Sequence, residues 1–465
     1  MTEILDLSEI MERGRIQATG NEVLTPEAAA KIGAALGSYL GPKGILVVAR
    51  EYSNNNRMLK RAFIGGVMSA GIDILNLHSA PAPVLQFCIR RFGASAGVYF
   101  SSVSSGKLQN QIRFYDSSGI EFNRASIDSV NEYFKNNKIY RAKPLEVGAI
   151  SDIPHTQDIY KKALPQFVNR KLMKQKNLHI VVDCSYGPGA IVIPSILTDL
   201  KNDVIAINAY QNDQKATEMF PNLRSIKDVI NIVKAINADL GVVLDTDGSR
   251  ALYIDETGRI LSYEELMMFF LKYEEKISKL KGSPIIATES SSKILDQFAI
   301  ENCGFTMIKT QNFPGEISRG LREERAAFGG ADTMKYYFPQ YGPFSDATFT
   351  TLKIIEILAR ENLPLSALIR AFPRTIHAYK TVPLTEEKLN RFKEQLRKLL
   401  RTTEIEGMDY QDIMIGTKIV LKEKGWVTIT PSVHANAIEL EAEGNDPEKS
   451  EDLIRYAEDL IQPIL

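Results

Sequence analysis

Short apolar runs alternate with amphipathic stretches along the first three quarters of the chain. Runs at 45–48, 72–77 and 96–100 are only four to six residues long and mainly apolar, which predicts strands. Between them, residues 57–69 and 83–91 carry apolar side chains at helical spacing. Strands that alternate with helices in this way indicate βαβ units and a largely parallel sheet.

The same alternation is repeated twice more, from residue 179 and from residue 263. From residue 375 the pattern changes to a charged helix at 386–401, several short strands and a final helix at 449–461, which predicts an α+β module. We therefore predict an α/β fold of three similar domains with mixed, largely parallel sheets, followed by a C-terminal α+β domain. The expected boundaries are 1–150, 151–256, 257–374 and 375–465.

A small polar stretch at 101–110 separates the strand at 98–100 from another at 111–115. Ligands of open parallel sheets bind at the carboxyl ends of strands, and this stretch follows such an end. Its serines, with Gly106 and Lys107, suit the close approach of a phosphate or a sugar. By itself, however, a stretch of this kind is more often a plain connection between two strands.

Composition narrows the classes of function. The 465 residues are enough for about three or four domains, and 44% hydrophobic with 24% charged residues is ordinary globular composition. The net charge of −1 gives no reason to expect a nucleic acid or an acidic membrane as a partner. We find no apolar run that spans a bilayer and no signal-peptide pattern, so we expect a cytoplasmic protein. Cys88, Cys184 and Cys303 lie far apart in apolar segments and are expected to be buried free thiols.

Four stretches share a pattern with one protein family. They are NQIRFY at 110–115 with the following Gly119, DTDGSR at 245–250, FGGADTMK at 328–335 and TPSVHAN at 430–436. In these stretches, and along nearly the whole chain, the sequence resembles the α-D-phosphohexomutases, the family of phosphoglucomutase, phosphomannomutase and phosphoglucosamine mutase. The resemblance implies that the three α/β domains and the C-terminal domain surround a central cleft.

The first stretch departs from the family at the residue that carries the transferred phosphoryl group. The family pattern T-A-S-H-N-P falls on residues 101–106, and Val103 takes the place of its serine. A valine side chain has no lone pair and cannot store a phosphoryl group between two steps. Ser102 and Ser104 flank Val103 and are the candidate nucleophiles if the protein is active.

The family also places an arginine near the reacting phosphate, close to the start of the chain. That position holds Gln17 here, and Arg15 lies two residues earlier. If the segment is extended, the two side chains share a face at a separation of roughly 6.6 Å, which makes Arg15 a candidate catalytic residue. The alternative is that Arg15 is a solvated surface charge.

The second stretch corresponds to the family's D-G-D-x-D-R, in which three aspartates hold Mg²⁺. Asp245, Asp247 and Arg250 are kept, and Ser249 replaces the third aspartate. Because Val103 also removes the phosphoserine oxygen, two of the four protein ligands implied by the resemblance are absent. We therefore expect weak Mg²⁺ binding at most, by Asp245, Asp247 and Ser249, with Arg250 in support of the phosphate. Without the resemblance, a hairpin turn would be the simpler interpretation.

The third and fourth stretches would bind the sugar and its non-reacting phosphate. Ala331 replaces the glutamate that grips sugar hydroxyls, and Thr430 replaces an arginine, which removes a bidentate phosphate donor. The remaining candidates for binding a phosphorylated sugar are Lys107, Arg113, Thr333, Lys335, Ser432 and His434.

These replacements lead to competing hypotheses about function. The preferred one is a phosphohexomutase-like protein without mutase activity, which serves as a binding, regulatory or partner subunit; its expected partners are a sugar phosphate or nucleotide sugar, another protein, or a second copy of itself. The alternative is an active Mg²⁺-dependent phosphosugar mutase that uses Ser102 or Ser104. A third hypothesis is a structural partner that binds no ligand.

Overall fold

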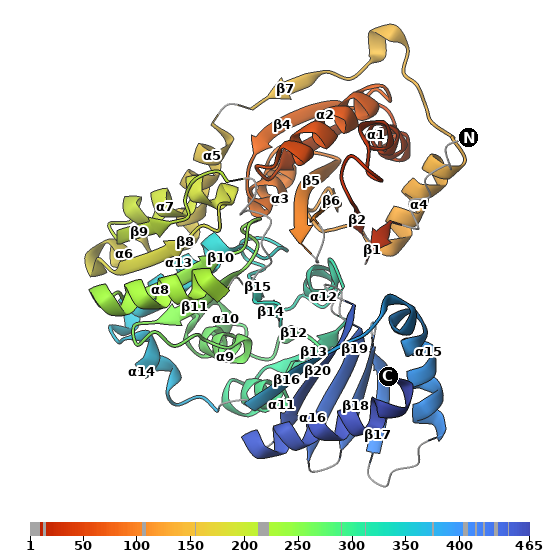
Figure 1. The fold of residues 1–465 in the computed structure, drawn as a ribbon. Helices are drawn as coiled ribbons and strands as arrows, with labels where there is room; N and C mark the ends of the chain where they lie inside the picture. Colours follow the sequence, from red (N-terminus) through yellow and green to blue (C-terminus); the bar gives the residue numbers. More distant parts are fainter. Residues whose placement is uncertain are drawn as a thin grey trace. The chain divides into compact units, whose positions relative to one another are not determined.

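The computed structural model describes two compact units. The described residues are 10–12, 15–104, 108–153, 155–212, 223–289, 291–311, 313–373, 376–402, 408–413, 416–421, 424–431, 436–444 and 446–465. The large unit comprises Met1–Thr288 and Ala299–Ala371, and the small unit comprises Glu289–Phe298 and Phe372–Leu465. The large unit holds three sheets and the small unit holds one (Figure 1).

The first sheet of the large unit has seven strands in the order β1-β2-β6-β5-β3-β4-β7. Strands β5, β3, β4 and β7 run parallel, whereas β1, β2, β6 and β5 pair antiparallel. The strands are β1 (Met11–Glu12), β2 (Arg15–Ala18), β3 (Ile45–Arg50), β4 (Asp73–Ser79), β5 (Ala96–Ser104), β6 (Leu108–Asp116) and β7 (Ile150–Asp152). The helices are α1 (Pro26–Leu40), α2 (Asn54–Met68), α3 (Ala82–Arg91) and α4 (Arg124–Lys135).

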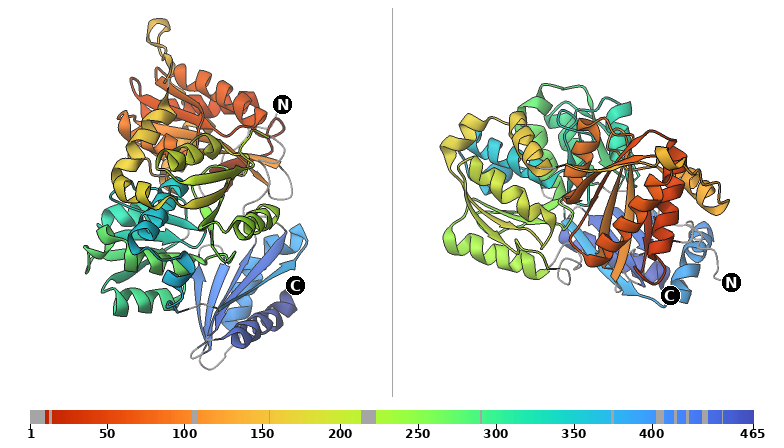
Figure 2. Two further views of the ribbon diagram at one scale, coloured as in Figure 1. Left: turned by 90° about the vertical axis from the view of Figure 1, so that its left-hand side faces the viewer. Right: turned by 90° about the horizontal axis from the view of Figure 1, so that it is seen from above.

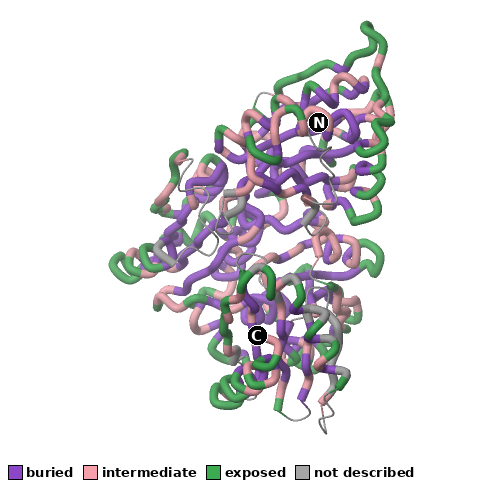
Figure 3. Tube along the Cα trace, turned by 45° about the vertical axis from the view of Figure 1, so that its right-hand side comes forward, coloured by how far each residue is buried: buried purple, intermediate pink, exposed green. Residues whose placement is uncertain are grey.

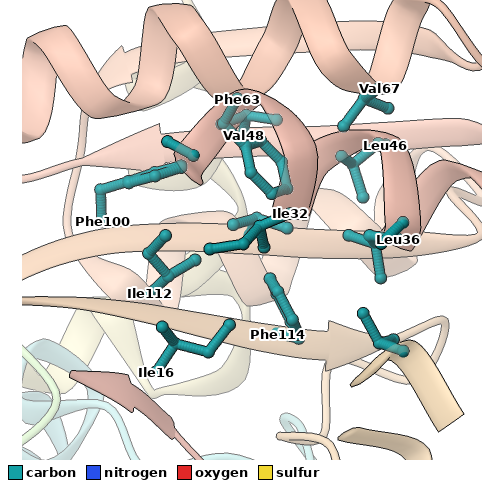
Figure 4. Close-up of a cluster of buried hydrophobic side chains, with 14 of the residues drawn as sticks. Ile16, Ile32, Leu36, Leu46, Val48, Phe63, Val67, Phe100, Ile112 and Phe114 are labelled. Atoms are coloured by element: carbon teal, nitrogen blue, oxygen red, sulfur yellow. The ribbon is translucent and has the colours of Figure 1, made fainter. Parts of the chain in front are cut away.

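An apolar core fills the space between this sheet and helices α1, α2 and α4. Phe63 of α2 packs there with Val48 of β3 and Phe100 of β5 (Figure 4). Helix α3 covers the opposite face, where a side chain at Gly97 would collide with Ile89 at 2.2 Å. The sheet is therefore covered on both faces, as parallel strands require.

The other two sheets of the large unit are smaller and alike. Each has three parallel strands and one antiparallel strand at an edge, in the orders β11-β10-β8-β9 and β13-β12-β14-β15. Their strands are β8 (His179–Asp183), β9 (Asp203–Ile207), β10 (Leu240–Leu244), β11 (Ala251–Asp255), β12 (Pro284–Thr288), β13 (Thr306–Thr310), β14 (Phe328–Ala331) and β15 (Lys335–Tyr337). The associated helices are α5 (Thr156–Ala163), α6 (Arg170–Lys176), α7 (Ile193–Asp199), α8 (Leu223–Ile236), α9 (Tyr263–Tyr273), α10 (Glu275–Ser278), α12 (Glu316–Glu323), α13 (Ala347–Glu361) and α14 (Leu365–Ile369). The prediction of mixed, largely parallel sheets is confirmed.

The small unit is an α+β module with an antiparallel sheet in the order β16-β20-β19-β18-β17. Helix α16 packs along this sheet, as the left view of Figure 2 shows. Its elements are β16 (Ile376–Pro383), β17 (Met408–Ile413), β18 (Gly416–Leu421), β19 (Gly425–Pro431), β20 (Ala437–Gly444), α11 (Lys293–Gln297), α15 (Glu386–Thr402) and α16 (Pro447–Ile461). Residues 289–298 join this unit from within the expected third domain, and Ser292 Oγ donates to Glu443 Oε1 at 2.6 Å.

Burial follows this layering, with buried strands inside each unit and exposed residues on the outer helices and connections (Figure 3). Cys88, Cys184 and Cys303 are buried and unpaired, as predicted. Among the described residues, no helix is both long and apolar enough to cross a bilayer.

Two expected connections contain strands instead. The polar stretch 101–110 was expected to be a loop, but β5 continues to Ser104 and β6 begins at Leu108. Its polar side chains are tolerated because they pair between the sheet and α2, where Asn110 Nδ2 donates to Asn56 Oδ1 at 2.7 Å. The expected linker 143–154 includes β7, which adds to the edge of the first sheet beside β4.

Candidate functional site

The first three sequence stretches come together in the large unit. Residues 245–250 connect β10 to β11, Arg113 lies in β6, and Lys335 begins β15. The N–H of Ala82, at the start of α3, donates to the carbonyl of Asp247 at 2.9 Å and anchors the connection to the first sheet. The three small polar segments thus share one site.

Asp247 and Arg113 form a buried ion pair at the centre of this site. Arg113 Nη2 lies 2.7 Å from Asp247 Oδ2, and the two side chains are only 5% and 12% exposed. The guanidinium also stacks over the ring of Tyr99, its cross-strand partner in β5, at 4.8 Å from the ring centre. Burial alone would raise the pKa of Asp247, but the charges of Arg113 and Lys335 hold it well below its usual range. Asp247 is therefore ionised and already neutralised by the protein.

Asp245 has its own cation. Arg250 Nε donates to Asp245 Oδ2 at 2.8 Å. Burial and the neighbouring charge of Asp247 raise the pKa of Asp245. The backbone N–H of Ser249 donates to Asp247 Oδ1 at 2.8 Å, which fixes the turn.

A third carboxyl, Glu51, joins β5 to the connection at 245–250. Glu51 Oε2 accepts from the backbone N–H of Ser102 at 2.9 Å, and Oε1 accepts from the hydroxyl of Thr246 at 3.3 Å. The side chain is almost fully buried, and this burial raises its pKa to about 8, with a further contribution from the charge of Asp247. Glu51 is therefore mainly protonated at neutral pH.

Arg15 and Glu121 form a second ion pair beside the first. The contact is bidentate, with Nε 2.5 Å from Oε1 and Nη2 2.8 Å from Oε2. Burial would raise the pKa of Glu121, but the adjacent Arg15 lowers it. Arg15 shares a strand face with Gln17, as expected. The alternative of a solvated surface charge is wrong, because Arg15 is bound by Glu121, which lies 106 residues further along the chain.

A small cavity of about 40 Å³ opens between these groups. Its lining includes Arg113, Lys335, Glu121, Ser249, Ser318 and Ser345. Burial and the nearby charge of Arg15 lower the pKa of Lys335 to about 8, so most of the lysine stays protonated at pH 7. The lining is therefore polar, with basic groups from two different sheets.

The residues present do not fit the Mg²⁺ ion that the resemblance implies. Asp245 keeps one oxygen, Oδ1, without a hydrogen-bond partner among the described residues, but each aspartate is bound by an arginine. A divalent cation there would lie beside the positive charges of Arg113 and Lys335, and Ser249 supplies no charge to offset them. In the described part of the chain, no group of three or more His, Cys, Asp or Glu side chains could hold a metal ion.

The other predicted site residues either lie away from the cavity or fall outside the described residues. Ser102 is buried, and its hydroxyl accepts from Asn56 Nδ2 at 3.0 Å, on the α2 side of β5. Since alternate side chains of a strand face opposite ways, Ser102 points away from the face that carries Tyr99 and Arg113. Thr333 lies in the turn between β14 and β15 and does not line the cavity. Lys107, Ser432, His434 and the side chains of Val103 and Ser104 lie outside the described residues.

Sequence reasoning missed Glu51 and Glu121. Glu51 could have been found, because it directly follows β3, a parallel strand whose carboxyl end faces the ligand side of such sheets. Glu121 lies in an irregular segment between β6 and α4, and nothing in its local sequence predicts a buried partner for Arg15.

Comparisons with known proteins agree with this architecture. Family models of phosphoglucomutase/phosphomannomutase α/β/α domains I, II and III match residues 12–141, 158–258 and 263–376. A phosphoglucomutase/phosphomannomutase of Thermococcus kodakarensis is 29% identical over 458 residues, which cover 97% of this chain and 98% of that protein. A probable phosphoglucosamine mutase of Pyrococcus furiosus is 25% identical and covers 96% of each chain.

A solved structure supports the fold. A phosphoglucomutase/phosphomannomutase family protein from Burkholderia thailandensis has a TM-score of 0.80 and 21% identity, and the match covers 99% of both chains. The similarity covers three domains and nearly the whole chain, and is not confined to isolated motifs. The chain belongs to the α-D-phosphohexomutase family.

Proposed function

We propose that this chain acts on a phosphorylated hexose as a phosphohexose mutase, an intramolecular phosphotransferase. End-to-end similarity to relatives named as phosphomutases supports this proposal over a protein without activity. The structural observation that carries it is the cavity between β6 and β15, where Arg113 and Lys335 present basic groups beside Ser249. Phosphoryl transfer depends mainly on positioning and on neutralising the charge of the transferred group.

Ser102 and Ser104 are the two candidate phosphoryl carriers. The hydroxyl of Ser102 is engaged by Asn56 on the α2 side of β5, away from Arg113. A nucleophile must reach the phosphorus next to the groups that neutralise its charge. Position 104 lies two residues further along the same strand, so this requirement does not favour Ser104 over Ser102, and both are tested.

A second candidate function is binding of a sugar phosphate without turnover. Two observations favour it: Val103 occupies the phosphoserine position, and Asp247 is already paired with Arg113. In this case the same cavity would hold the phosphate oxygens, but no side chain would accept the phosphoryl group.

One set of measurements separates these functions. Purified protein is incubated with a hexose 1,6-bisphosphate, and its intact mass is compared with those of Ser102→Ala and Ser104→Ala. The proposal predicts an added phosphate on the wild type that one of the two variants lacks, together with interconversion of hexose 1- and 6-phosphates by the wild type. Turnover is followed with and without Mg²⁺.

The negative outcomes are equally informative. A rise in melting temperature with a hexose phosphate, without added mass or turnover, would establish the binding function instead. If neither mass, turnover nor melting temperature changes, both proposals are wrong.

A further inference from the structure

We infer that Arg113 and Lys335 take the place of the divalent cation at this site, so that its cavity binds the oxygens of a phosphoryl group without a metal. This inference rests on the proposed phosphosugar ligand but makes a separate claim. It concerns how negative charge is neutralised, whether or not a phosphoryl group is transferred.

Two contacts hold the guanidinium of Arg113 in the position where it neutralises Asp247. It forms the 2.7 Å ion pair with Asp247 and is held from the other side by the ring of Tyr99. Its Nε is buried and makes no hydrogen bond to any described residue, although this residue lines the cavity. A buried guanidinium donor without a partner is costly unless a ligand or water completes it.

Lys335 supplies the positive charge that is left over. Asp247, Asp245 and Glu121 each have an arginine partner, from Arg113, Arg250 and Arg15 respectively. Among the residues that the structure describes, no carboxylate lies within ion-pair distance of Lys335. The ammonium therefore remains as a positive charge at the cavity, where it attracts an anion and repels a metal ion.

The size of the cavity sets what enters it. A volume of about 40 Å³ is a few times the roughly 10–15 Å³ that one water molecule needs. The terminal oxygens of a phosphoryl group fit this space. The hydroxyls of Ser249 and Ser318 line the same cavity and can donate to such oxygens, whereas the hydroxyl of Ser345 already donates to the carbonyl of Ser249 at 2.8 Å.

The metal half of the inference is tested with Mn²⁺, whose binding is read by electron paramagnetic resonance on the free protein. Wild type should not bind Mn²⁺ at millimolar concentration. Ser249→Asp alone should not bind it either, because Arg113 still occupies Asp247. Ser249→Asp combined with Arg113→Gln should bind Mn²⁺ at least about tenfold more tightly than Ser249→Asp. Millimolar binding by wild type, equal binding by the two variants, or no binding by a folded double variant would overturn the inference.

The claim that the cavity binds an anion without a metal is tested on the wild type and a single variant. Inorganic phosphate in the presence of EDTA should raise the melting temperature of wild type, and Mg²⁺ should add nothing to this rise. Lys335→Gln is the matched control and should show a smaller rise, which separates site binding from general stabilisation by a kosmotropic salt. A rise that requires Mg²⁺, an equal rise in Lys335→Gln, or no rise would refute the inference. Loss of hexose phosphate turnover, with these results intact, would count against the proposed function alone.

Discussion

Replacing Glu51 with glutamine should stabilise the large unit at neutral pH and leave its stability near pH 4.5 almost unchanged. The wild-type side chain is 4% exposed, and burial raises its pKa to about 8, with further contributions from the charges of Asp247 and Asp245. Glutamine has the shape of the protonated acid but does not titrate. Its amide oxygen can still accept the N–H of Ser102.

The magnitude follows from the difference in proton binding between the folded and unfolded states. In the unfolded chain the carboxyl loses its proton near pH 4.5, whereas in the folded chain it keeps it up to about pH 8. Because the folded state binds more protons in this window, the free energy of unfolding falls as the pH rises. Each pH unit costs about 1.4 kcal/mol. Between pH 4.5 and 7, wild type should therefore lose about 3 kcal/mol that the Glu51→Gln variant keeps.

The assay is urea unfolding at several pH values between 4.5 and 8.5, followed by far-UV circular dichroism and by hydrogen exchange of the β3–α2 segment. Trp426 is the one tryptophan of the chain and lies in the small unit, so its fluorescence does not report on Glu51. Glu22→Gln, at an exposed position, is the control and should show no gain that grows with pH. A stability difference between Glu51→Gln and wild type that stays constant over this range would refute the raised pKa.

Two further changes test the packing of the large unit. Gly66→Ala in α2 should destabilise the protein by more than about 2 kcal/mol, because the new Cβ would lie 1.9 Å from the carbonyl oxygen of Ala30. Gly65→Ala, one residue earlier, meets no atom within 4 Å and should stabilise the helix by about 0.5–1 kcal/mol, so melting temperatures that move in the same direction would contradict this packing. Lys353→Met should cost about 3–5 kcal/mol, because it leaves Glu274, 3.0 Å away, and Glu356, 2.8 Å away, without this cation. Thermal unfolding measures the loss, and adding Glu274→Gln should recover much of it; no recovery would mean that the buried charge of Glu274 is not the cause.

The fold was largely predictable because its strands and helices follow simple hydrophobic periods. The strand expected at 45–48 became β3 and the helix expected at 83–91 became α3, each with one or two extra residues at one end. The stretch 101–110 was wrongly predicted to be a loop because its polar side chains suggested exposure to solvent. In the fold these side chains satisfy one another across β5, β6 and α2, as Asn56 does with Ser102 and Asn110.

The site was predictable only where its residues fall within local motifs. The sequence indicated Arg113, Asp247 and Lys335 as separate candidates, because each lies in a short recognisable stretch. It did not indicate that Arg113 binds Asp247, because the two residues are far apart in the chain and belong to different sheets. Ion pairs of this kind depend on how domains pack, which local patterns of residues do not encode.

The balance of buried charge distinguishes this site from a metal centre. A metal centre concentrates carboxylates, and the ion neutralises their excess negative charge. Here Asp247, Asp245 and Glu121 are each neutralised by an arginine of the same chain, and Ser249 adds no fourth negative charge. With Glu51 mainly protonated at neutral pH and the pKa of Asp245 raised to about 7, the net charge that remains is positive and includes that of Lys335. A positively charged site favours an anion over a metal ion. The replacement of the third aspartate by Ser249 and the presence of Arg113 and Lys335 at the cavity therefore have the same physical explanation.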